Sequence, residues 1–477
     1  IGGGFGGLLM GARTQEAGIP NFRIIEKAGD FGGTWYWNRY PGAQCDIESY
    51  VYLPLLEEVG YIPKEKYSFR PEIFEHAQRV GKHFDLYSRA YFQTQVEDLR
   101  WNDDESQWVI RSDRGDEIRA KYVVMSSGPL NRPKLPGIPG VESFKGHTFH
   151  TSRWDYDYTG GSSEGGLDKI SDKRIAVIGT GATAIQSVSH LGTGAKHLYV
   201  FQRTPSSIDE RGNKPTDPKW AESLEPGWQA HRNHNFASIL AGEQPEEDLV
   251  DDGWTDLFKT LGNLMSSQDG AEVSGEELGM LAEIADFQKM NRTRKRVDDS
   301  VQDGEVAETL KPWYRPWCKR PTFNDEFLPT FNRPNVTLVD TSGKGVERIT
   351  EKGLVVDGTE YEVDCIIFAT GFEVGTDYSR RAGYGISGVD GLTVSEKWTN
   401  GLSTFHGMHA KGFPNCFFFG PAQSAFTATY TFSLDENGIH LAHILSEAKK
   451  RGATRIEASA EAEAAWVQTI IDKARLT

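Results

Sequence analysis

The sequence predicts an α/β protein with two nucleotide-binding units and a separate helical segment, and three observations support this prediction. The first is a glycine-rich turn at residues 2–7 that leads into an apolar helical start. The second is a similar turn at residues 179–184, directly after a strand of buried type. The third is a polar, acidic stretch at residues 206–310 with the apolar spacing of amphipathic helices, which two such units do not require. We therefore expect two Rossmann-like units with a helical insertion.

The first turn carries Gly2, Gly4 and Gly7 in the spacing G-x-G-x-x-G. Glycine at these positions lets a pyrophosphate approach backbone N–H groups at the N-terminus of a helix. The next expected strand, at residues 22–25, ends at Glu26, whose carboxylate would suit the hydroxyls of a ribose. A glycine-rich start alone could be a flexible tail. Together with Glu26 it predicts a dinucleotide site, which we assign to FAD.

The second turn carries Gly179, Gly181 and Ala184, and it follows the apolar strand 174–178. At the offset where the first unit has Glu26, the second unit has Arg203. A guanidinium can bind the 2′-phosphate of NADPH through two hydrogen bonds, so we expect NADPH in the second unit. The alternative, that Arg203 is a solvated surface cation, remains open.

The remaining segments complete the two units. Residues 32–46 form a loop broken by glycine and proline, with aromatic side chains and one acid, as expected of a cofactor clasp. Residues 156–172 are rich in Gly, Ser and Asp and are expected to be a mobile surface loop. Further strands are expected at 122–125, 197–201, 336–339, 364–368 and 416–419, and helices at 254–264, 276–290 and 434–451.

Composition excludes several classes of protein. The 477 residues exceed one ordinary core, and 38% of them are hydrophobic. The formal net charge of -16 argues against a nucleic-acid partner, and no apolar run is long enough for a membrane span. The four cysteines form no C-x-x-C pair, so we expect no metal site and a reducing, cytoplasmic location. Because no strand precedes the first turn, we interpret the chain as clipped.

Between the two turns lies the motif F-x-G-x-x-x-H-x-x-x-W-D, formed by Phe144, Gly146, His150, Trp154 and Asp155. In order along the chain, the segments GGTW, YPG, this motif, GTGATA, FQR, CKRP and ATGF resemble the Baeyer-Villiger monooxygenases, flavoproteins that depend on FAD and NADPH. The resemblance covers essentially the whole chain. Related flavin monooxygenases that oxygenate N or S have a similar motif that usually lacks the terminal Trp-Asp.

This resemblance implies a reaction and a division of the chain. NADPH would reduce FAD, O2 would add to give a C4a-peroxyflavin, and the peroxide would attack a ketone carbonyl to give an ester or lactone. The implied FAD-binding domain comprises residues 1–143 and 373–477, and the NADP-binding domain comprises residues 173–205 and 311–372. Residues 144–172 would be the interdomain linker and residues 206–310 the helical insertion.

The resemblance also implies roles for individual residues. Arg320 would be the fixed positive charge beside the peroxide, and Asp46 its hydrogen-bonded partner. Lys319 would lie near the NADPH 2′-phosphate, and His150 would couple domain motion to catalysis by hydrogen bonding. Alternatively, Arg320 is part of a structural ion pair, Asp46 caps a turn, His150 acts as a base and Trp154 only packs. The expected cofactor-binding residues are Gly2, Gly4, Gly7, Glu26, Gly33, Thr34, Trp35, Asp46, Gly179, Thr180, Gly181, Ala182, Thr183, Arg203, Thr204, Lys319, Thr370 and Gly371.

Two other functions remain possible at this point. One is oxygenation of an N or S nucleophile, and the other is a flavin-binding sensor without turnover. The glycine-rich loop and the insertion more closely resemble the subset of the family that acts on bulky or macrocyclic ketones, so we expect a bulky or cyclic ketone as substrate. In many members a Trp in the last helix region approaches the nicotinamide ribose, and His440 takes that place in our alignment.

Overall fold

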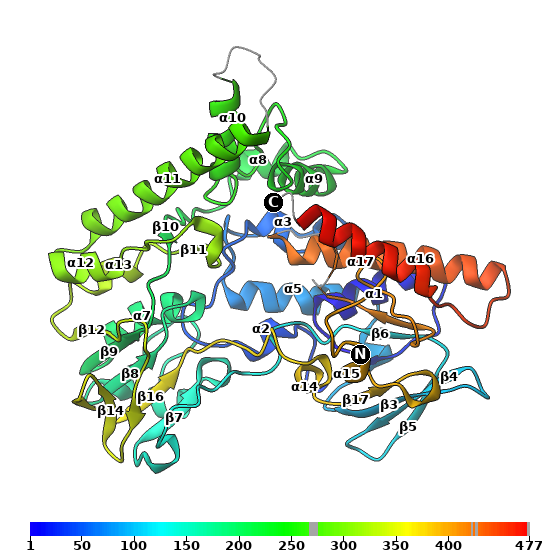
Figure 1. The fold of residues 1–477 in the computed structure, drawn as a ribbon, viewed down its shortest axis with the longest axis horizontal. Helices are drawn as coiled ribbons and strands as arrows, with labels where there is room; N and C mark the ends of the chain where they lie inside the picture. Colours follow the sequence, from blue (N-terminus) through cyan, green and yellow to red (C-terminus); the bar gives the residue numbers. More distant parts are fainter. Residues whose placement is uncertain (267–274, 421–422, 425–427, 475–477) are drawn as a thin grey trace.

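The computed structural model describes residues 1–266, 275–420, 423–424 and 428–474. Figure 1 shows two lobes side by side, with the helices of the insertion above them. The first lobe is built around α1 and α16, and the second around a five-stranded sheet. The predicted α/β fold with two Rossmann-like units and a helical insertion is thereby confirmed.

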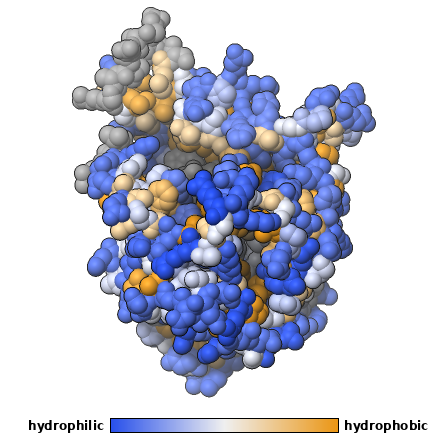
Figure 2. Space-filling view, turned by 90° about the vertical axis from the view of Figure 1, so that its right-hand side faces the viewer, coloured by the Kyte–Doolittle hydropathy of each residue, from blue (hydrophilic) through white to orange (hydrophobic). Residues whose placement is uncertain are grey.

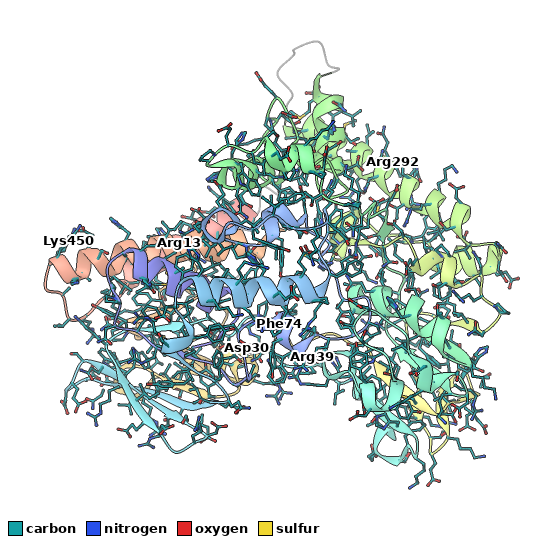
Figure 3. All side chains as sticks on the ribbon, turned by 180° about the vertical axis from the view of Figure 1, so that it is seen from behind. Arg13, Asp30, Arg39, Phe74, Arg292 and Lys450 are labelled. Carbon is teal, nitrogen blue, oxygen red and sulfur yellow. The ribbon has the colours of Figure 1, made fainter. Side chains whose placement is uncertain are left out.

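The first lobe combines the two ends of the chain. Helix α1 (Phe5–Glu16) packs along α16 (Tyr430–Lys450), and Arg13 of α1 binds Asp435 of α16 through two hydrogen bonds of 2.7 Å (Figure 3). Strand β18 (Cys416–Phe418) pairs in parallel with β6 (Val123–Met125). Residues far apart in sequence thus share one core.

The other elements of this lobe are short. A four-stranded sheet has the order β17-β3-β4-β5 and a two-stranded sheet joins β1 to β2. Strand β1 is shorter than the predicted strand 22–25. The bounds are β1 (Ile24–Ile25), β2 (Ala90–Tyr91), β3 (Val96–Asn102), β4 (Gln107–Ser112), β5 (Glu117–Ala120), β17 (Gly385–Ser387), α2 (Thr34–Trp37), α3 (Ser49–Tyr52), α4 (Leu56–Val59), α5 (Arg70–His83), α14 (Tyr378–Ala382), α15 (Val394–Lys397) and α17 (Ala460–Ala474).

The second lobe holds a parallel sheet of order β12-β9-β8-β16-β7. Helix α7 (Ala182–Gly194) begins at the second glycine turn and covers this sheet. Part of the expected linker motif forms the edge strand β7. The bounds are β7 (His147–His150), β8 (Arg174–Ile178), β9 (His197–Gln202), β12 (Val336–Asp340), β13 (Arg348–Ile349), β14 (Gly353–Val356), β15 (Thr359–Glu362), β16 (Cys365–Phe368) and α13 (Phe327–Thr330).

The insertion is helical, as predicted, but its helices differ in extent. The expected helix 254–264 begins two residues later, and the expected helix 276–290 continues for ten further residues. Two short strands at its ends, β10 and β11, pair in parallel and close the segment at its base. The bounds are β10 (Ile208–Asp209), α8 (Pro218–Glu222), α9 (Trp228–Leu240), α10 (Asp256–Ser266), α11 (Gly275–Ser300), α12 (Gly304–Leu310) and β11 (Thr322–Phe323).

Two further predictions need correction. The expected loop 156–172 contains the helix α6 (Tyr156–Thr159) and buries Leu167 and Ile170, because these apolar residues pack into the core of the second lobe. The helix α16, expected from residue 434, begins at Tyr430, and its first turn already buries Thr431.

The face shown in Figure 2 is mostly hydrophilic, with apolar side chains gathered in small groups. Among the described residues, no helix combines the length and apolar character that a bilayer crossing demands. All four cysteines are free thiols, of which only Cys318 is exposed.

Candidate active site

A large cavity of about 1380 Å³ runs between the lobes. This volume exceeds the roughly 300–1,000 Å³ typical of a site for one drug-sized ligand, as expected of a site for more than one molecule. Both glycine turns open onto it. A Cβ on Gly2 would lie 2.3 Å from the Ser126 carbonyl oxygen, and one on Gly179 would lie 2.6 Å from that of Ala369. The backbone therefore passes too close to its neighbours for any side chain there, so both turns require glycine at these positions.

Most of the predicted site residues line this cavity. They are Gly2, Gly4, Glu26, Gly33, Thr34, Trp35, Asp46, Gly179, Thr180, Gly181, Ala182, Thr183, Arg203, Thr204, Lys319, Arg320, Thr370 and Gly371. Gly7 and the five residues of the linker motif do not line it. His440 is also absent from the lining; it lies on the exposed side of α16, with its ring 6.0 Å from that of His406.

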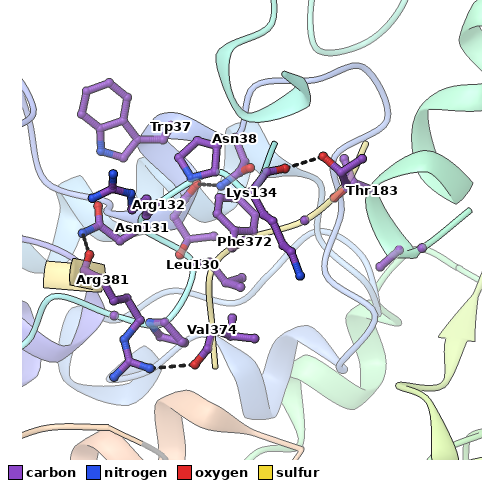
Figure 4. A pocket seen from close by; sticks show the side chains of 18 of the residues that line it. Trp37, Asn38, Leu130, Asn131, Arg132, Lys134, Thr183, Phe372, Val374 and Arg381 are labelled. Carbon is purple, nitrogen blue, oxygen red and sulfur yellow. Dashed lines mark hydrogen bonds between the residues drawn. The ribbon is translucent and has the colours of Figure 1, made fainter. Parts of the chain in front are cut away.

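Residues of the segments 127–134 and 372–384 also line the cavity, and the sequence analysis did not identify them. Figure 4 shows part of this wall, where the Asn131 side-chain amide donates to the carbonyl of Arg381 at 3.2 Å. The Arg381 guanidinium in turn donates to the carbonyl of Val374 at 2.8 Å. These residues come from loops whose approach depends on the tertiary fold, so residue type and spacing alone could not identify them.

Glu26 already has backbone partners at the first turn. One carboxylate oxygen accepts the N–H of Gly3 at 2.6 Å, and the other accepts the N–H of Ala28 at the same distance. The side chain is buried, yet it still borders the cavity. Since each carboxylate oxygen has two lone pairs, a ribose hydroxyl can share the same acid. The arrangement fits a cofactor ribose and at the same time stabilises the turn.

The second turn is bordered by two cations. Arg203 is exposed at the carboxyl end of β9, and the Lys319 ammonium donates to the Pro205 carbonyl at 3.0 Å and to the Thr204 hydroxyl. Burial and the neighbouring Arg203 together lower the pKa of Lys319. Two like charges held side by side favour an anion between them, so this corner fits the 2′-phosphate of NADPH.

Asp46 and Arg320 form an ion pair on the cavity wall although 274 positions separate them in sequence. Two guanidinium nitrogens donate to the two carboxylate oxygens, each at 2.7 Å. The Asp46 side chain is only 6% exposed, whereas 53% of the Arg320 side chain faces the open cavity. Burial opposes ionisation of Asp46, but Arg320 outweighs it and lowers the pKa of Asp46. Burial likewise opposes the charge of Arg320, yet Asp46 raises its pKa.

The structure adds Trp254 to this pair. Its indole N–H donates to the backbone carbonyl of Asp46 at 2.7 Å, and its ring centre lies 5.7 Å from the Arg320 guanidinium. Phe323 packs against the same indole. Sequence reasoning placed Trp254 at the start of an amphipathic helix, where an aromatic residue gives no signal of a contact with a distant loop.

The linker motif lies behind the cavity wall. The neutral His150 ring hydrogen-bonds to the Gly371 carbonyl at 3.1 Å and to the Ser152 hydroxyl at 2.8 Å, and burial lowers its pKa to about 4. Trp154 donates to the Thr159 hydroxyl at 3.0 Å, and Asp155 caps α6. His150 thus joins β7 to the end of β16 by hydrogen bonds, and it borders the cavity only through Gly371.

The insertion contributes no residue between 207 and 310 to the cavity lining within the described part of the chain. Instead it packs behind the loop that carries Asp46. Gln229 donates to the carbonyl of Leu53 at 2.6 Å and accepts the N–H of Leu56 at 2.8 Å. The insertion therefore supports the Asp46 loop from a position next to it.

Comparisons with known proteins agree with this geometry. A family described as pyridine nucleotide-disulphide oxidoreductase matches residues 1–239. Neopentalenolactone D synthase of Streptomyces avermitilis is 52% identical over 99% of this chain and 80% of its own length. Baeyer-Villiger monooxygenase ATR8 of Stachybotrys chlorohalonatus is 52% identical over 99% of this chain and 76% of its own length.

Solved structures show the same relationship. The polycyclic ketone monooxygenase of Thermothelomyces thermophila has a TM-score of 0.89 and 42% identity, covering 98% of this chain and 78% of that one. An OTEMO complex with FAD and NADP has a TM-score of 0.83 and 27% identity, covering 100% and 90%. The chain belongs to the Baeyer-Villiger monooxygenases, flavoprotein oxidoreductases that use FAD and NADPH to insert one oxygen atom of O2 beside a ketone carbonyl.

Proposed function

We propose that the Asp46–Arg320 pair is the reaction centre of this monooxygenase and that its substrate is a bulky or cyclic ketone. The observation that carries the proposal is the two-pronged ion pair, with its guanidinium half open to the cavity between the two glycine turns. When bound there, reduced FAD supplies the activation of O2 and NADPH supplies the hydride.

Arg320 is suited to stabilise negative charge on oxygen. Its guanidinium stays protonated, and its orientation is set by Asp46 before any substrate arrives. Fixed donors of this kind stabilise a developing oxyanion without reorganising at the moment of reaction. Asp46 contributes the orientation, and its carboxylate is itself held by the loop that Trp254 supports.

The proposed substrate class is supported by the names of similar proteins. The similar proteins include a polycyclic ketone monooxygenase and a ketocytochalasin monooxygenase. Oxygenation of N or S nucleophiles is not favoured, because three of the relatives bear the name Baeyer-Villiger monooxygenase.

We further propose that Arg203 and Lys319 select NADPH through its 2′-phosphate, and that residues 1–143 with 373–477 bind FAD. Arg203→Gln should raise KM for NADPH about tenfold or more and leave KM for NADH nearly unchanged, since only NADPH has the extra charge-assisted hydrogen bonds. Equal effects on both cofactors would contradict this assignment. We place the enzyme in the cytoplasm, where NADPH is available, and fractionation of cells would test it.

A panel of polycyclic ketones, small ketones and sulfides tests the function as a whole. The proposal expects ester or lactone from polycyclic ketones in a ratio near one product per NADPH consumed. Products from sulfides alone would overturn it. The ratio is the sharper readout, because reduced flavin that reacts with O2 unproductively consumes NADPH without giving product.

A further inference from the structure

Four buried polar side chains, Tyr40, Gln44, Gln186 and Arg211, meet beside Asp46, and we call them the polar junction. Tyr40, Gln44 and Gln186 also line the cavity. All four are less than 9% exposed. We propose that Gln44, Gln186 and Arg211 are positioning residues for the Asp46–Arg320 pair, so that the second nucleotide-binding turn and the insertion both act on the reaction centre through Gln44. This inference rests on the proposed role of the Asp46–Arg320 pair.

Gln186 connects the junction to the second lobe. It lies on α7, the helix that starts at the second glycine turn. Its carbonyl oxygen accepts the Tyr40 hydroxyl at 2.9 Å and the Gln44 backbone N–H at 3.3 Å, and its amide donates to the Gln44 carbonyl at 2.8 Å. Both backbone groups of Gln44 are therefore held by one side chain from the other lobe.

Arg211 connects the junction to the insertion. Its guanidinium donates to the side-chain oxygen of Gln44, and its own backbone N–H donates to Asp325 at 3.0 Å. The Gln44 side-chain amide donates to the Tyr67 carbonyl at 2.8 Å. The side chain and the backbone of Gln44 are thus fixed from three directions, and Asp46 follows two residues later.

The charges around this junction support a role beyond packing. Two of the three guanidinium nitrogens of Arg211, Nε and Nη2, are buried without a hydrogen-bond partner among the described residues. Burying a guanidinium with so few hydrogen-bond partners costs free energy. Among the acids that interact with Arg211, Asp46 has the largest effect on its pKa. Asp46 thus interacts with two guanidiniums, Arg320 on the cavity wall and the buried Arg211, and Asp325 also acts on Arg211. The second cation favours the ionised form of Asp46, which orients Arg320.

The titratable groups near Asp46 determine which ionisation a pH profile of the product yield reports. Besides Arg320 and Arg211 they are Tyr40, Cys45 and Tyr52, and burial raises the pKa of each of these three. They stay neutral across the ordinary range of pH. The two guanidiniums stay charged, so the acid side of a pH profile reports on Asp46 alone within this group.

The test compares Gln186→Met, Arg211→Met and Arg211→Lys in the FAD-loaded enzyme. We expect Gln186→Met and Arg211→Met to lower the yield of lactone per NADPH at least fivefold, with KM for NADPH changed less than twofold. Arg211→Met should also move the acid limb of the yield to higher pH, because the pKa of Asp46 rises without the second cation. Arg211→Lys should restore most of the yield.

Arg296→Met is the matched control. Arg296 binds the same Asp325 as Arg211, and it also donates to the Ile208 and Asn324 carbonyls. Within the described residues it forms no hydrogen bond or ion pair with Asp46 or Gln44. Its yield per NADPH should stay within twofold of wild type, even where its melting temperature falls. If Arg296→Met and Gln186→Met lower the yield equally, the junction has only a structural role and the inference fails.

Amide hydrogen exchange in the cofactor-free protein gives a second readout. Gln186→Met should speed exchange in the peptide containing residues 43–47, and Arg296→Met should not. Unchanged exchange in Gln186→Met would overturn the inference. Arg320→Ala distinguishes the proposed reaction centre from the proposed role of the polar junction. If Arg320→Ala keeps the wild-type yield, the proposed reaction centre is wrong. If Arg320→Ala loses the yield but the junction variants keep it, only the role of the junction is wrong.

Discussion

Two buried acids on one loop, Asp46 and Glu48, each pair with an arginine, yet their charges differ. Each carboxylate oxygen of Asp46 accepts one N–H of Arg320, at 2.7 Å. Glu48 receives both N–H groups of Arg232 on a single oxygen, at 3.0 and 2.6 Å. The other oxygen of Glu48 is buried without a hydrogen-bond partner in the described part of the chain.

The pKa values follow this difference. Burial acts against ionisation of both acids, but only for Asp46 does the arginine overcome it, so that its pKa is lowered. For Glu48 burial outweighs Arg232 and raises the pKa to about 7. An acid keeps its charge inside a protein when both oxygens are satisfied. Asp46 and Arg320 at the cavity therefore both stay ionised, whereas Glu48, paired with Arg232 of the insertion, titrates near pH 7.

Arg320→Ala should break this contrast most strongly. Lactone formation should fall about 100-fold or more, since removal of one preorganised donor to a developing oxyanion has an effect of that size. Arg232→Ala should leave it within about threefold. Chromatographic assay of lactone at saturating NADPH measures both, and similar losses in the two variants would show that the pairs do not differ in function.

Asp46→Asn should have the next largest effect. The amide retains the shape but keeps only one oxygen acceptor and has no charge, so it loses one charge-assisted hydrogen bond to Arg320 and weakens the other. Such bonds contribute roughly 1.5–3 kcal/mol each, so a tenfold or greater loss of kcat is expected. Glu48→Gln is the matched change and should leave kcat within twofold. A wild-type kcat in Asp46→Asn would mean that Arg320 is oriented without its partner.

Removing Arg232 should affect stability in a pH-dependent way. Arg232→Met removes the cation that acts most strongly on Glu48 and leaves only the weaker Lys66, so the variant should lose about 1 kcal/mol more at pH 8, where wild-type Glu48 is ionised, than at pH 5, where it is neutral. Urea unfolding at the two pH values measures this difference. An equal loss at both would indicate that Arg232 contributes packing only.

Glu48 itself should make stability fall as pH rises from about 4.5 to about 7. Because its pKa is higher in the folded chain than in the unfolded chain, the folded state binds the proton more tightly in that window, and the stabilisation is lost as the proton leaves. The contribution is roughly 3 kcal/mol at most. Glu48→Gln should remove this slope from a series of melting curves; a slope that persists in the variant belongs to other groups.

Sequence reasoning reached some features of this loop and missed others. The glycine turns, the strand β8 and the acid Asp46 follow from local patterns or from resemblance to a family. The partners Trp254, Gln186 and Arg211 do not, because each acts through a contact with residues more than 140 positions away. Such contacts depend on how the lobes pack, and no local spacing encodes them.

The same limit explains the errors in the segments. Residues 156–172 have the composition of a loop, but Leu167 and Ile170 are buried, because neighbouring strands offer them an apolar surface. The motif residues Trp154 and Asp155 distinguish the family, yet in the structure one packs and the other caps a helix. A residue that identifies a family can thus stabilise the fold without lining the site.

Labelling with ¹⁸O2 tests whether the Asp46–Arg320 pair is the reaction centre. Wild type, Glu48→Gln and Arg320→Ala would each be given NADPH, a polycyclic ketone and ¹⁸O2, and the lactone would be analysed by mass spectrometry. We expect one labelled oxygen per lactone from wild type and from Glu48→Gln. Arg320→Ala should consume NADPH and release hydrogen peroxide in place of lactone. Labelled lactone from Arg320→Ala at the wild-type rate would contradict the assignment of the Asp46–Arg320 pair as the reaction centre.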